Sequence, residues 1–288
     1  MRLLVHIKHN KMELYSKVCF DCNAVITKSY STSFSLGIRM FSRELRYPIY
    51  AIYGFVRFAD EIVDTFHHID KKQFLDEFAR DTFRAIEDKI SLNPVLHSFQ
   101  EVVNKYSIDQ ELIRAFLHSM EMDLYKSVYN KKDLDTYIYG SAEVVGLMCL
   151  YVFLNGDEDE YQRLKGPAQS LGAAFQKINF LRDMKSDYLE RGRVYFPDID
   201  FNLFSESDKK SIQDEIQIDF DDAYVGIAAL PRSSRLGVYC AYKYYINLFF
   251  KIKSLSAETI KERRIRVSDK RKLYLLTTSA FQHKFDLI

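Results

Sequence analysis

The sequence predicts an all-α protein, a helical bundle of one domain. The 288 residues include 10 Gly and 5 Pro, few enough to favour helices over many tight hairpins. Hydrophobic residues make up 47% of the chain, and they recur at helical spacing over long stretches. Length alone would allow two domains of about 150 residues each. Because no low-complexity linker divides the chain, we expect one large domain.

The expected helices follow one another in order. A helix over 13–29 is followed by a break at 30–33. The next helix, over 46–64, starts near Pro48, because a first turn tolerates a missing N–H. An amphipathic helix is then marked by Phe74, Leu75, Phe78, Phe83, Ile86 and Ile90. After a loop at 93–94, helices are expected over 107–128, 133–154, 160–190, 208–229 and 232–253. A loop over 196–208 and a last helix from about residue 268 complete the list.

Composition limits the partners and the compartment. The formal net charge of +1 gives no global field for nucleic acid, so no such partner is expected and any phosphate site must be built locally. Cys19 and Cys22 form a C-x-x-C without a second ligand pair for zinc. We interpret them as two thiols one helical turn apart in a reducing cytoplasm.

The chain shows no run of about 18 apolar residues, and its start is too short and polar for a signal peptide. We therefore expect a cytoplasmic protein that is soluble or rests on a membrane surface. Met12 offers an alternative start. In that reading residues 1–11 are an N-terminal extension, and residues 12–288 form the catalytic domain.

Two pairs of carboxylates stand out. Asp60 and Asp64 lie in "RFADEIVD", and Asp183 and Asp187 lie in "QKINFLRDMKSDYLERGRVYFP", with Asn179 one turn earlier. Each pair shares one helix face at about 6 Å along the axis. Like charges at this spacing repel, so a pair is either solvated or serves a cation. Either pair alone is common on solvated helices.

The joint pattern is more specific, because an Arg accompanies each pair: Arg57 before Asp60, and Arg182 beside Asp183. Mg²⁺ is often shared between carboxylates and substrate phosphates, and Arg holds phosphate oxygens in bidentate fashion. Two facing helices of this kind predict a metal–diphosphate site. Other sites lack their motifs: there is no Glu-x-x-His pair, P-loop, G-x-G-x-x-G or G-x-S-x-G.

From about residue 19 to about residue 275 the chain resembles the squalene/phytoene synthase family, the head-to-head prenyl transferases. "QKINFLRDMKSDYLERGRVYFP" is similar to the second Asp-rich signature of that family, including Arg193, Tyr195 and Pro197. "AIYGFVRFADEIVD" resembles the first Asp-rich motif. "SYSTSFSLG" matches the diphosphate loop in position, and "GSAEVVG" matches the helix of small residues.

The resemblance implies an isoprenoid-synthase-type bundle with a central apolar cavity, and it implies roles for the matching residues. Mg²⁺, with Mn²⁺ as an alternative, would be bound by Asp60, Asp64, Asn179, Asp183 and Asp187. Prenyl diphosphate substrates would be held through their phosphate oxygens by Ser31, Ser33, Arg57, Gln176, Arg182 and Arg264. The reaction chamber would be lined by Phe34, Tyr53, Val145, Leu147 and Tyr245. The four Asp residues, Tyr53 and Tyr245 would be catalytic.

The reaction implied is the condensation of two geranylgeranyl diphosphates through a cyclopropyl (prephytoene) diphosphate to phytoene. This is the first committed step of carotenoid synthesis, and no nicotinamide is expected. The residues of these motifs resemble those of bacterial carotenoid enzymes. The small residues Gly140, Ser141, Ala142 and Gly146 also leave room at the chamber wall for a long isoprenoid tail. Squalene or dehydrosqualene synthesis from farnesyl diphosphate is the alternative within the family. A catalytically silent scaffold is the alternative outside it, disfavoured because both Asp pairs are intact.

Three features depart from the family pattern or lie outside its motifs. Glu61 stands where many members have an Asp, and Tyr30 and Thr32 replace residues that are often basic. The segment 261–272 carries seven basic residues. Such a segment is either a solvated polar end or a contact for diphosphate and for an anionic membrane surface. Because the expected product is a hydrocarbon, the second reading places the protein peripherally on the inner membrane surface. The sequence gives no oligomeric state.

Overall fold

The computed structural model is helical throughout the part of the chain that it describes: residues 2–197, 199–285 and 288, with the backbone alone for 2–11. Its one pairing of extended backbone is an isolated bridge between Val128 and Val194. The predicted all-α fold is therefore confirmed. The helices are α1 (Arg2–Tyr30), α2 (Thr32–Ile38), α3 (Arg43–Asp64), α4 (Lys71–Asp88), α5 (Pro94–Tyr106), α6 (Gln110–Tyr125), α7 (Lys131–Ile138), the π-turn η1 (Tyr139–Glu143), α8 (Val144–Phe153), α9 (Glu158–Arg191), α10 (Glu206–Ala229), α11 (Arg232–Lys253), α12 (Ala257–Glu262) and α13 (Asp269–Lys284).

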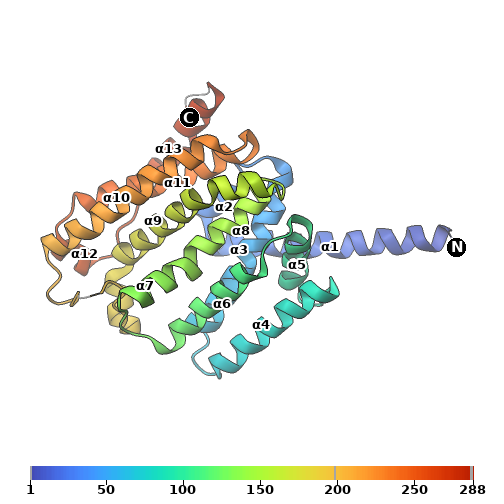
Figure 1. Ribbon diagram of the computed structural model, residues 1–288, viewed down its shortest axis with the longest axis horizontal. Coiled ribbons are helices and arrows are strands. Elements are labelled where there is room, and N and C mark those ends of the chain that lie inside the picture. The colour runs from blue at the N-terminus through green and yellow to red at the C-terminus, as the bar shows by residue number, and fades with distance from the viewer. Residues whose placement is uncertain (1, 198, 286–287) are drawn as a thin grey trace.

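The helices form one bundle in which α9 lies between two groups of neighbours. Helices α9, α10 and α11 lie side by side, and α8 packs against α9 from the other side (Figure 1). Helices α3, α5 and α6 pack together beyond α8. The N-terminal part of α1 extends beyond the body of the bundle (Figure 1).

Two apolar clusters hold the bundle together. The first joins α3, α5, α6 and α8, and the second joins α9, α10 and α11. In the first, the Phe55 ring is fully buried and stacks on Phe99 at a centroid distance of 4.0 Å. Truncating such a ring to Ala costs about 3–5 kcal/mol. These clusters fix the helices on either side of the site described below.

Two helix starts differ from the sequence prediction. Helix α3 begins at Arg43, so Pro48 lies in its second turn and not in its first. Pro48 has no N–H to donate to the carbonyl of Glu44, and α3 forgoes that hydrogen bond. The predicted loop at Asn93–Pro94 is instead the start of α5. The Asn93 side chain caps the helix by accepting from Val95 N, and Pro94 occupies the first turn.

The predicted helix over 133–154 is observed as α7, η1 and α8, with one π-turn in the middle. Gly140 in this turn faces α6, where a Cβ would lie 2.5 Å from the carbonyl oxygen of Ala115. Gly140 therefore permits close packing of two helices and does not face the cavity, contrary to the sequence prediction. Gly172 of α9 plays the same part on the other side, because a Cβ there would lie 2.9 Å from Ala142 O.

The same stretch, Lys131–Phe153, is long and apolar enough to cross a membrane by composition. Half of the relevant window is buried inside the bundle, as in the core helix of a folded domain. The predicted N-terminal extension, 1–11, lies outside the residues whose side chains the structure describes.

Candidate active site

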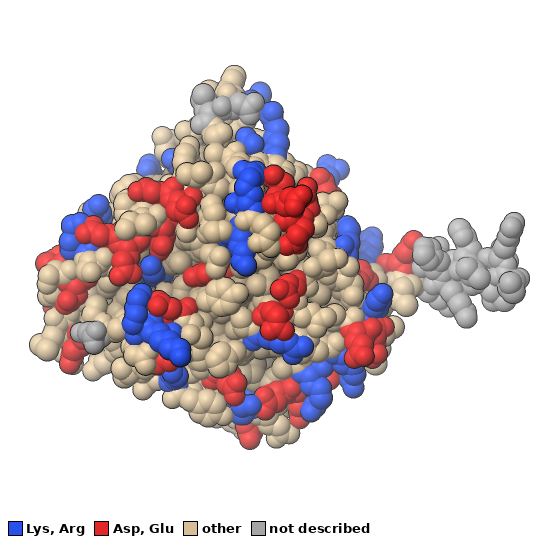
Figure 2. Space-filling view, in the orientation of Figure 1, with Lys and Arg blue, Asp and Glu red and all other residues tan. Residues whose placement is uncertain are grey.

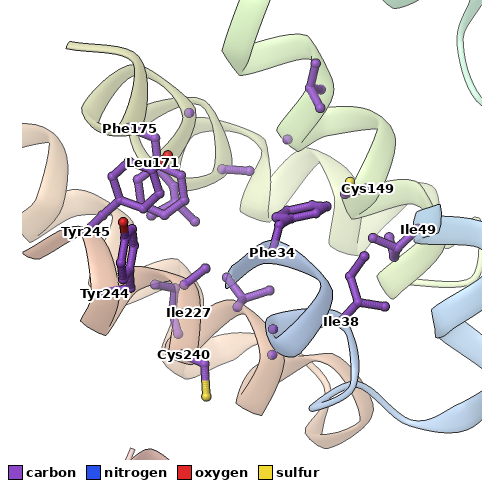
Figure 3. Close-up of a pocket in the computed structure, with 18 of the residues that line it drawn as sticks. Phe34, Ile38, Ile49, Cys149, Leu171, Phe175, Ile227, Cys240, Tyr244 and Tyr245 are labelled. Carbon is purple, nitrogen blue, oxygen red and sulfur yellow. The ribbon is translucent and has the colours of Figure 1, made fainter. Parts of the chain in front are cut away.

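A cavity of about 520 Å³ lies between α2, α3, α8, α9, α10, α11 and α13. Most of its wall is apolar, as Figure 3 shows for Ile38, Ile49 and Ile227. The sequence-predicted chamber residues Phe34, Tyr53, Val145 and Tyr245 all line it, and so do Ser31 and Ser33. Ser141, Ala142 and Gly146 contribute small side chains to the same wall.

Leu147 is not part of this wall. It lies two residues beyond Val145, about 200° around the helix, and it is fully buried in the first apolar cluster. The prediction that Leu147 lines the chamber is therefore wrong. Its side chain stabilises the fold on the opposite face of α8.

Aromatic rings face the cavity in two stacks. The Phe34 ring stacks on Tyr53 at 4.9 Å, and the Phe175 ring stacks on Tyr245 at 3.8 Å. Figure 3 shows Phe175 and Tyr245 face to face, with Phe34 projecting into the cavity from α2. Ring faces of this kind stabilise cations by about 0.5–2 kcal/mol each.

One end of the cavity is polar, and α9 supplies its polar side chains. Gln176, Asn179 and Arg182 follow one another at intervals of three residues and all line the cavity. The Tyr245 hydroxyl donates to Asn179 Oδ1 at 3.1 Å. Burial raises the pKa of Tyr245, so its hydroxyl stays a proton donor at neutral pH. The end therefore offers hydrogen-bond donors and one fixed positive charge.

The two acidic pairs meet beside this polar end. The Arg191 guanidinium bridges them, with Nη2 3.2 Å from Asp64 Oδ2 and Nη1 3.1 Å from Asp187 Oδ1. The predicted faces on α3 and α9 thus lie opposite each other. Asp60, Asp64, Asp183 and Asp187 themselves are not among the residues that line the cavity.

Burial disfavours the charged forms of two of these carboxylates. Desolvation, partly offset by Arg57, raises the pKa of Asp60 to about 7, and Asp64 adds repulsion. Desolvation likewise raises the pKa of Asp187 to about 6, against the attraction of Arg191. Carboxylates crowded in this way bind a further cation favourably.

Each of the three predicted diphosphate-binding Arg residues is held by a nearby carboxylate, as is Arg191, which the sequence analysis missed. Arg57 pairs with Glu61 and lies 3.7 Å from Asp60 Oδ2, and its guanidinium sits 4.3 Å above the Tyr30 ring. Glu61 thus positions Arg57, which gives a role to a residue that departs from the family pattern. Arg182 and Arg264 both contact Asp183, whose Oδ1 lies 3.1 Å from Arg182 Nε and 2.7 Å from Arg264 Nε.

A second network was not predicted from the sequence. The buried Asp123 carboxylate accepts hydrogen bonds from Tyr137, at 2.8 Å, and Tyr129, at 3.3 Å. It also pairs with Arg193, whose Nη1 lies 3.4 Å from Asp123 Oδ1 and 3.7 Å from Asp64 Oδ1. A signal existed: Asp123 falls on the buried stripe of α6 with Phe116 and Met120, where an unpaired charge is costly.

The donor chemistry of the acidic pairs fits a magnesium ion. All the side chains concerned offer oxygen, the ligand that Mg²⁺ prefers. Within the described residues no group of three or more His, Cys, Asp or Glu is arranged as a ready metal cage. Mg²⁺ commonly takes one or two carboxylates from a protein and completes its shell with water and substrate phosphates.

Comparison with known proteins decides the family. The family model described as squalene/phytoene synthase matches residues 27–271. The chain belongs to the squalene/phytoene synthase family. Phytoene synthase 2 of Solanum lycopersicum is 30% identical over 89% of this chain and 88% of its own length. The 4,4'-diapophytoene synthase of Staphylococcus haemolyticus is 28% identical over 70% of this chain and 69% of its own.

A solved structure supports the fold. The crystal structure of a dehydrosqualene synthase in complex with ligand superposes with a TM-score of 0.79, at 24% identity, over 93% of this chain and 98% of that one. The predicted family and the isoprenoid-synthase-type bundle are therefore confirmed. This squalene/phytoene synthase-type chain is a prenyltransferase of the head-to-head class, acting on prenyl diphosphates.

Proposed function

We propose that the protein condenses two molecules of geranylgeranyl diphosphate to phytoene through a cyclopropyl (prephytoene) diphosphate, without a reductant. The observation that carries the proposal is one apolar cavity that ends at polar side chains of α9, next to two opposed acidic pairs. Phytoene synthases of Solanum lycopersicum and, at 29% identity, a 15-cis-phytoene synthase of Synechocystis support this product.

The diphosphates would bind at the polar end. Arg57, Arg182 and Arg264 now pair with carboxylates, and an arriving diphosphate would compete for these guanidinium groups. Gln176 would donate from the cavity wall. Ser31 and Ser33 would offer hydroxyls, and the Ser31 oxygen already accepts from Phe34 N at 3.2 Å while its proton remains available.

Metal would be held by carboxylates from both helices: Asp60 and Asp64 of α3, with Asn179, Asp183 and Asp187 of α9. When bound, Mg²⁺ would neutralise charge on the departing diphosphate. Arg182 and the Tyr245 hydroxyl, which line the same cavity, would lie beside this leaving group. Their hydrogen bonds to it would strengthen as negative charge grows on it.

After the diphosphate leaves, the allylic cation would be attacked by the double bond of the second substrate. The apolar wall excludes the water that would otherwise capture this cation. The stacks of Phe34 with Tyr53, and of Phe175 with Tyr245, present ring faces to the cavity and would stabilise the positive charge.

The proposal also specifies the length of the isoprenoid tail, that of geranylgeranyl diphosphate. Ser141, Ala142 and Gly146 leave the η1–α8 wall without bulky side chains, which favours a longer tail. The relative named 4,4'-diapophytoene synthase keeps farnesyl diphosphate as the second candidate substrate.

Product analysis tests the proposal. Purified protein is incubated with Mg²⁺ and either farnesyl or geranylgeranyl diphosphate, with and without NADPH. A C40 hydrocarbon formed without NADPH is expected. A C30 product from farnesyl diphosphate alone would indicate dehydrosqualene synthesis, and one that requires NADPH would indicate squalene synthesis. No product from either substrate would favour a silent scaffold.

A designed variant tests the cavity argument. Ala142→Leu adds bulk to the lining, so the ratio of C40 to C30 product should fall. Gly166→Leu is the control, because it places the same leucine side chain on α9 at a site with no atom within 4 Å of a new Cβ. An unchanged ratio in Ala142→Leu would show that this wall does not limit the tail.

A further inference from the structure

Helix α13 presents different surfaces to the inside and the outside of the protein. On its inner side Lys272, Leu275 and Leu276 line the apolar cavity. On its outer side large apolar residues remain exposed by more than half of their surface: Leu273, Tyr274, Phe281 and Phe285. One helix therefore separates the cavity from an apolar outer face.

The exposed aromatic residues of this face share one side of the helix. Tyr274, Phe281 and Phe285 are spaced by seven and four residues, so they lie on one side of α13. The rings of Phe281 and Phe285 contact each other at a centroid distance of 4.6 Å. Large exposed apolar residues gathered on one side of a helix mark an interaction surface more often than isolated apolar residues do.

A groove of about 570 Å³ between α11 and α13 adjoins this patch. Two cations, Lys243 and Arg271, line it together with amides and hydroxyls, and no carboxylate is among its lining residues. Asn247 Oδ1 accepts from Arg271 Nε at 3.0 Å and from Nη2 at 2.8 Å, which fixes the guanidinium at the groove. The groove therefore suits an anion such as a phosphate group.

The C-terminal region that contains α13 carries a net positive charge. Residues 257–285 contain eight Lys and Arg against three Asp and Glu, although the complete chain carries a net charge of only +1. Figure 2 shows Lys and Arg side chains close to the apex where α13 ends. An apolar patch beside concentrated positive charge is complementary to an anionic lipid surface, which offers phosphates above an apolar interior.

We propose that the outer face of α13 docks the protein onto an anionic bilayer. Tyr274, Phe281 and Phe285 enter the interfacial layer, where aromatic rings are favoured, and Lys243 and Arg271 bind lipid phosphates. The inference of membrane docking depends only on the exposed residues. The benefit of docking rests on the proposed function, because the cavity wall on the other side of α13 would then face the phase in which a hydrocarbon product dissolves.

Vesicle flotation with the full chain tests the docking, independently of the product formed. Vesicles of phosphatidylcholine alone are compared with vesicles that also contain phosphatidylglycerol. We expect binding to the mixed vesicles that weakens as salt is added, because charge contributes to it. Phe281→Ser/Phe285→Ser and Lys243→Gln/Arg271→Gln should each reduce partitioning about tenfold or more.

Two control variants make similar changes on other helices. Ile218→Ser/Val225→Ser removes two exposed apolar residues of α10, and Arg84→Gln removes an exposed cation of α4. Both should bind as the unaltered chain does. Each variant should also keep its helical circular dichroism.

Three results would overturn the proposal. The first is equal binding of the unaltered chain to both kinds of vesicle, and the second is normal binding by both α13-face variants. The third comes from sedimentation velocity without lipid. A dimer that dissociates in Phe281→Ser/Phe285→Ser would mean that a second copy covers this face.

Discussion

Replacing Asp123 by Asn removes the charge of a buried carboxylate and leaves its shape nearly unchanged. Its partner Arg193 has 9% of its side-chain surface exposed, so water cannot take over the role of the lost counterion. Arg193 Nη2 keeps its 2.7 Å hydrogen bond to the backbone oxygen of Asp123, which the substitution does not touch. The change therefore tests the ion pair itself.

The structure sets the size of the effect. Removing one partner of a buried ion pair typically costs about 3–5 kcal/mol, because the other charge stays buried and unpaired. Arg193 cannot relieve this cost by losing its proton, because a guanidinium stays protonated in proteins at any ordinary pH. Arg193 Nη1 still lies 3.7 Å from Asp64 Oδ1, and this contact offsets part of the lost stability. We expect about 3 kcal/mol of lost stability.

The reverse change should cost less. In Arg193→Gln the unpaired Asp123 can take up a proton, because burial already raises its pKa to about 6 in the presence of Arg193. The double variant, with no charge left in the site, should be more stable than the sum of the single effects predicts. This asymmetry distinguishes an ion-pair effect from general damage to the core.

Urea unfolding at pH 8, followed by circular dichroism, measures these differences. Asp135→Asn is the control, because its pair with Lys131 is exposed and contributes about 0.3–0.5 kcal/mol. Asp123→Asn within about 1 kcal/mol of the unaltered chain would refute the argument that Arg193 depends on this carboxylate.

Three further predictions concern the site and the thiols. Asp183→Ala should lower kcat about 10²- to 10³-fold with Mg²⁺ present, because a leaving-group clamp acts mainly as charge develops; steady-state kinetics measures this. Arg57→Lys should lower kcat/KM about tenfold, since an ammonium cannot replace the planar guanidinium fork in the same assay. At pH 8 a chromogenic disulfide should react quickly with half-buried Cys22 but slowly with Cys149, whose pKa burial raises to about 12, so that it stays a neutral thiol.

Each of these has a contrary result. Near-normal turnover in Asp183→Ala would remove that residue from the metal site, with Asp159→Ala on the same helix as the control. Full activity in Arg57→Lys would mean that this position needs only a positive charge and not the planar guanidinium group. The fast thiol phase should vanish in Cys22→Ser, and fast reaction of Cys149 would mean that solvent reaches the cavity freely.

Most of the helices and both acidic faces could be predicted from local sequence patterns. Asp60 with Asp64, and Asp183 with Asp187, could be paired from spacing alone, because four residues make one turn in any helix. The start of α5 could not, since Asn–Pro serves equally in a loop and at a helix N-terminus. Only the packing of Pro94–Tyr106 decides between the two.

The two errors around α8 have different sources. Val145 and Leu147 lie two residues apart in α8, about 200° around its axis, so a regular helix already keeps Leu147 off the wall that Val145 lines. Gly140 lies within the π-turn at Tyr139–Glu143, and its neighbour is decided by a tertiary contact with Ala115 of α6, which local periodicity does not show. The bridge by Arg191 was missed because its partner Asp64 lies more than a hundred positions earlier in the chain.

Helix α9 carries Gly172, which lines the cavity, and Asp187 at the acidic face, fifteen positions apart on one helix. That spacing corresponds to about 22 Å along the axis. If the diphosphates bind beside Asp183 and Asp187 as proposed, the accepted isoprenoid length could change through cavity residues farther along α9, such as Ala168 or Leu171, while the groups that bind diphosphate stay where they are.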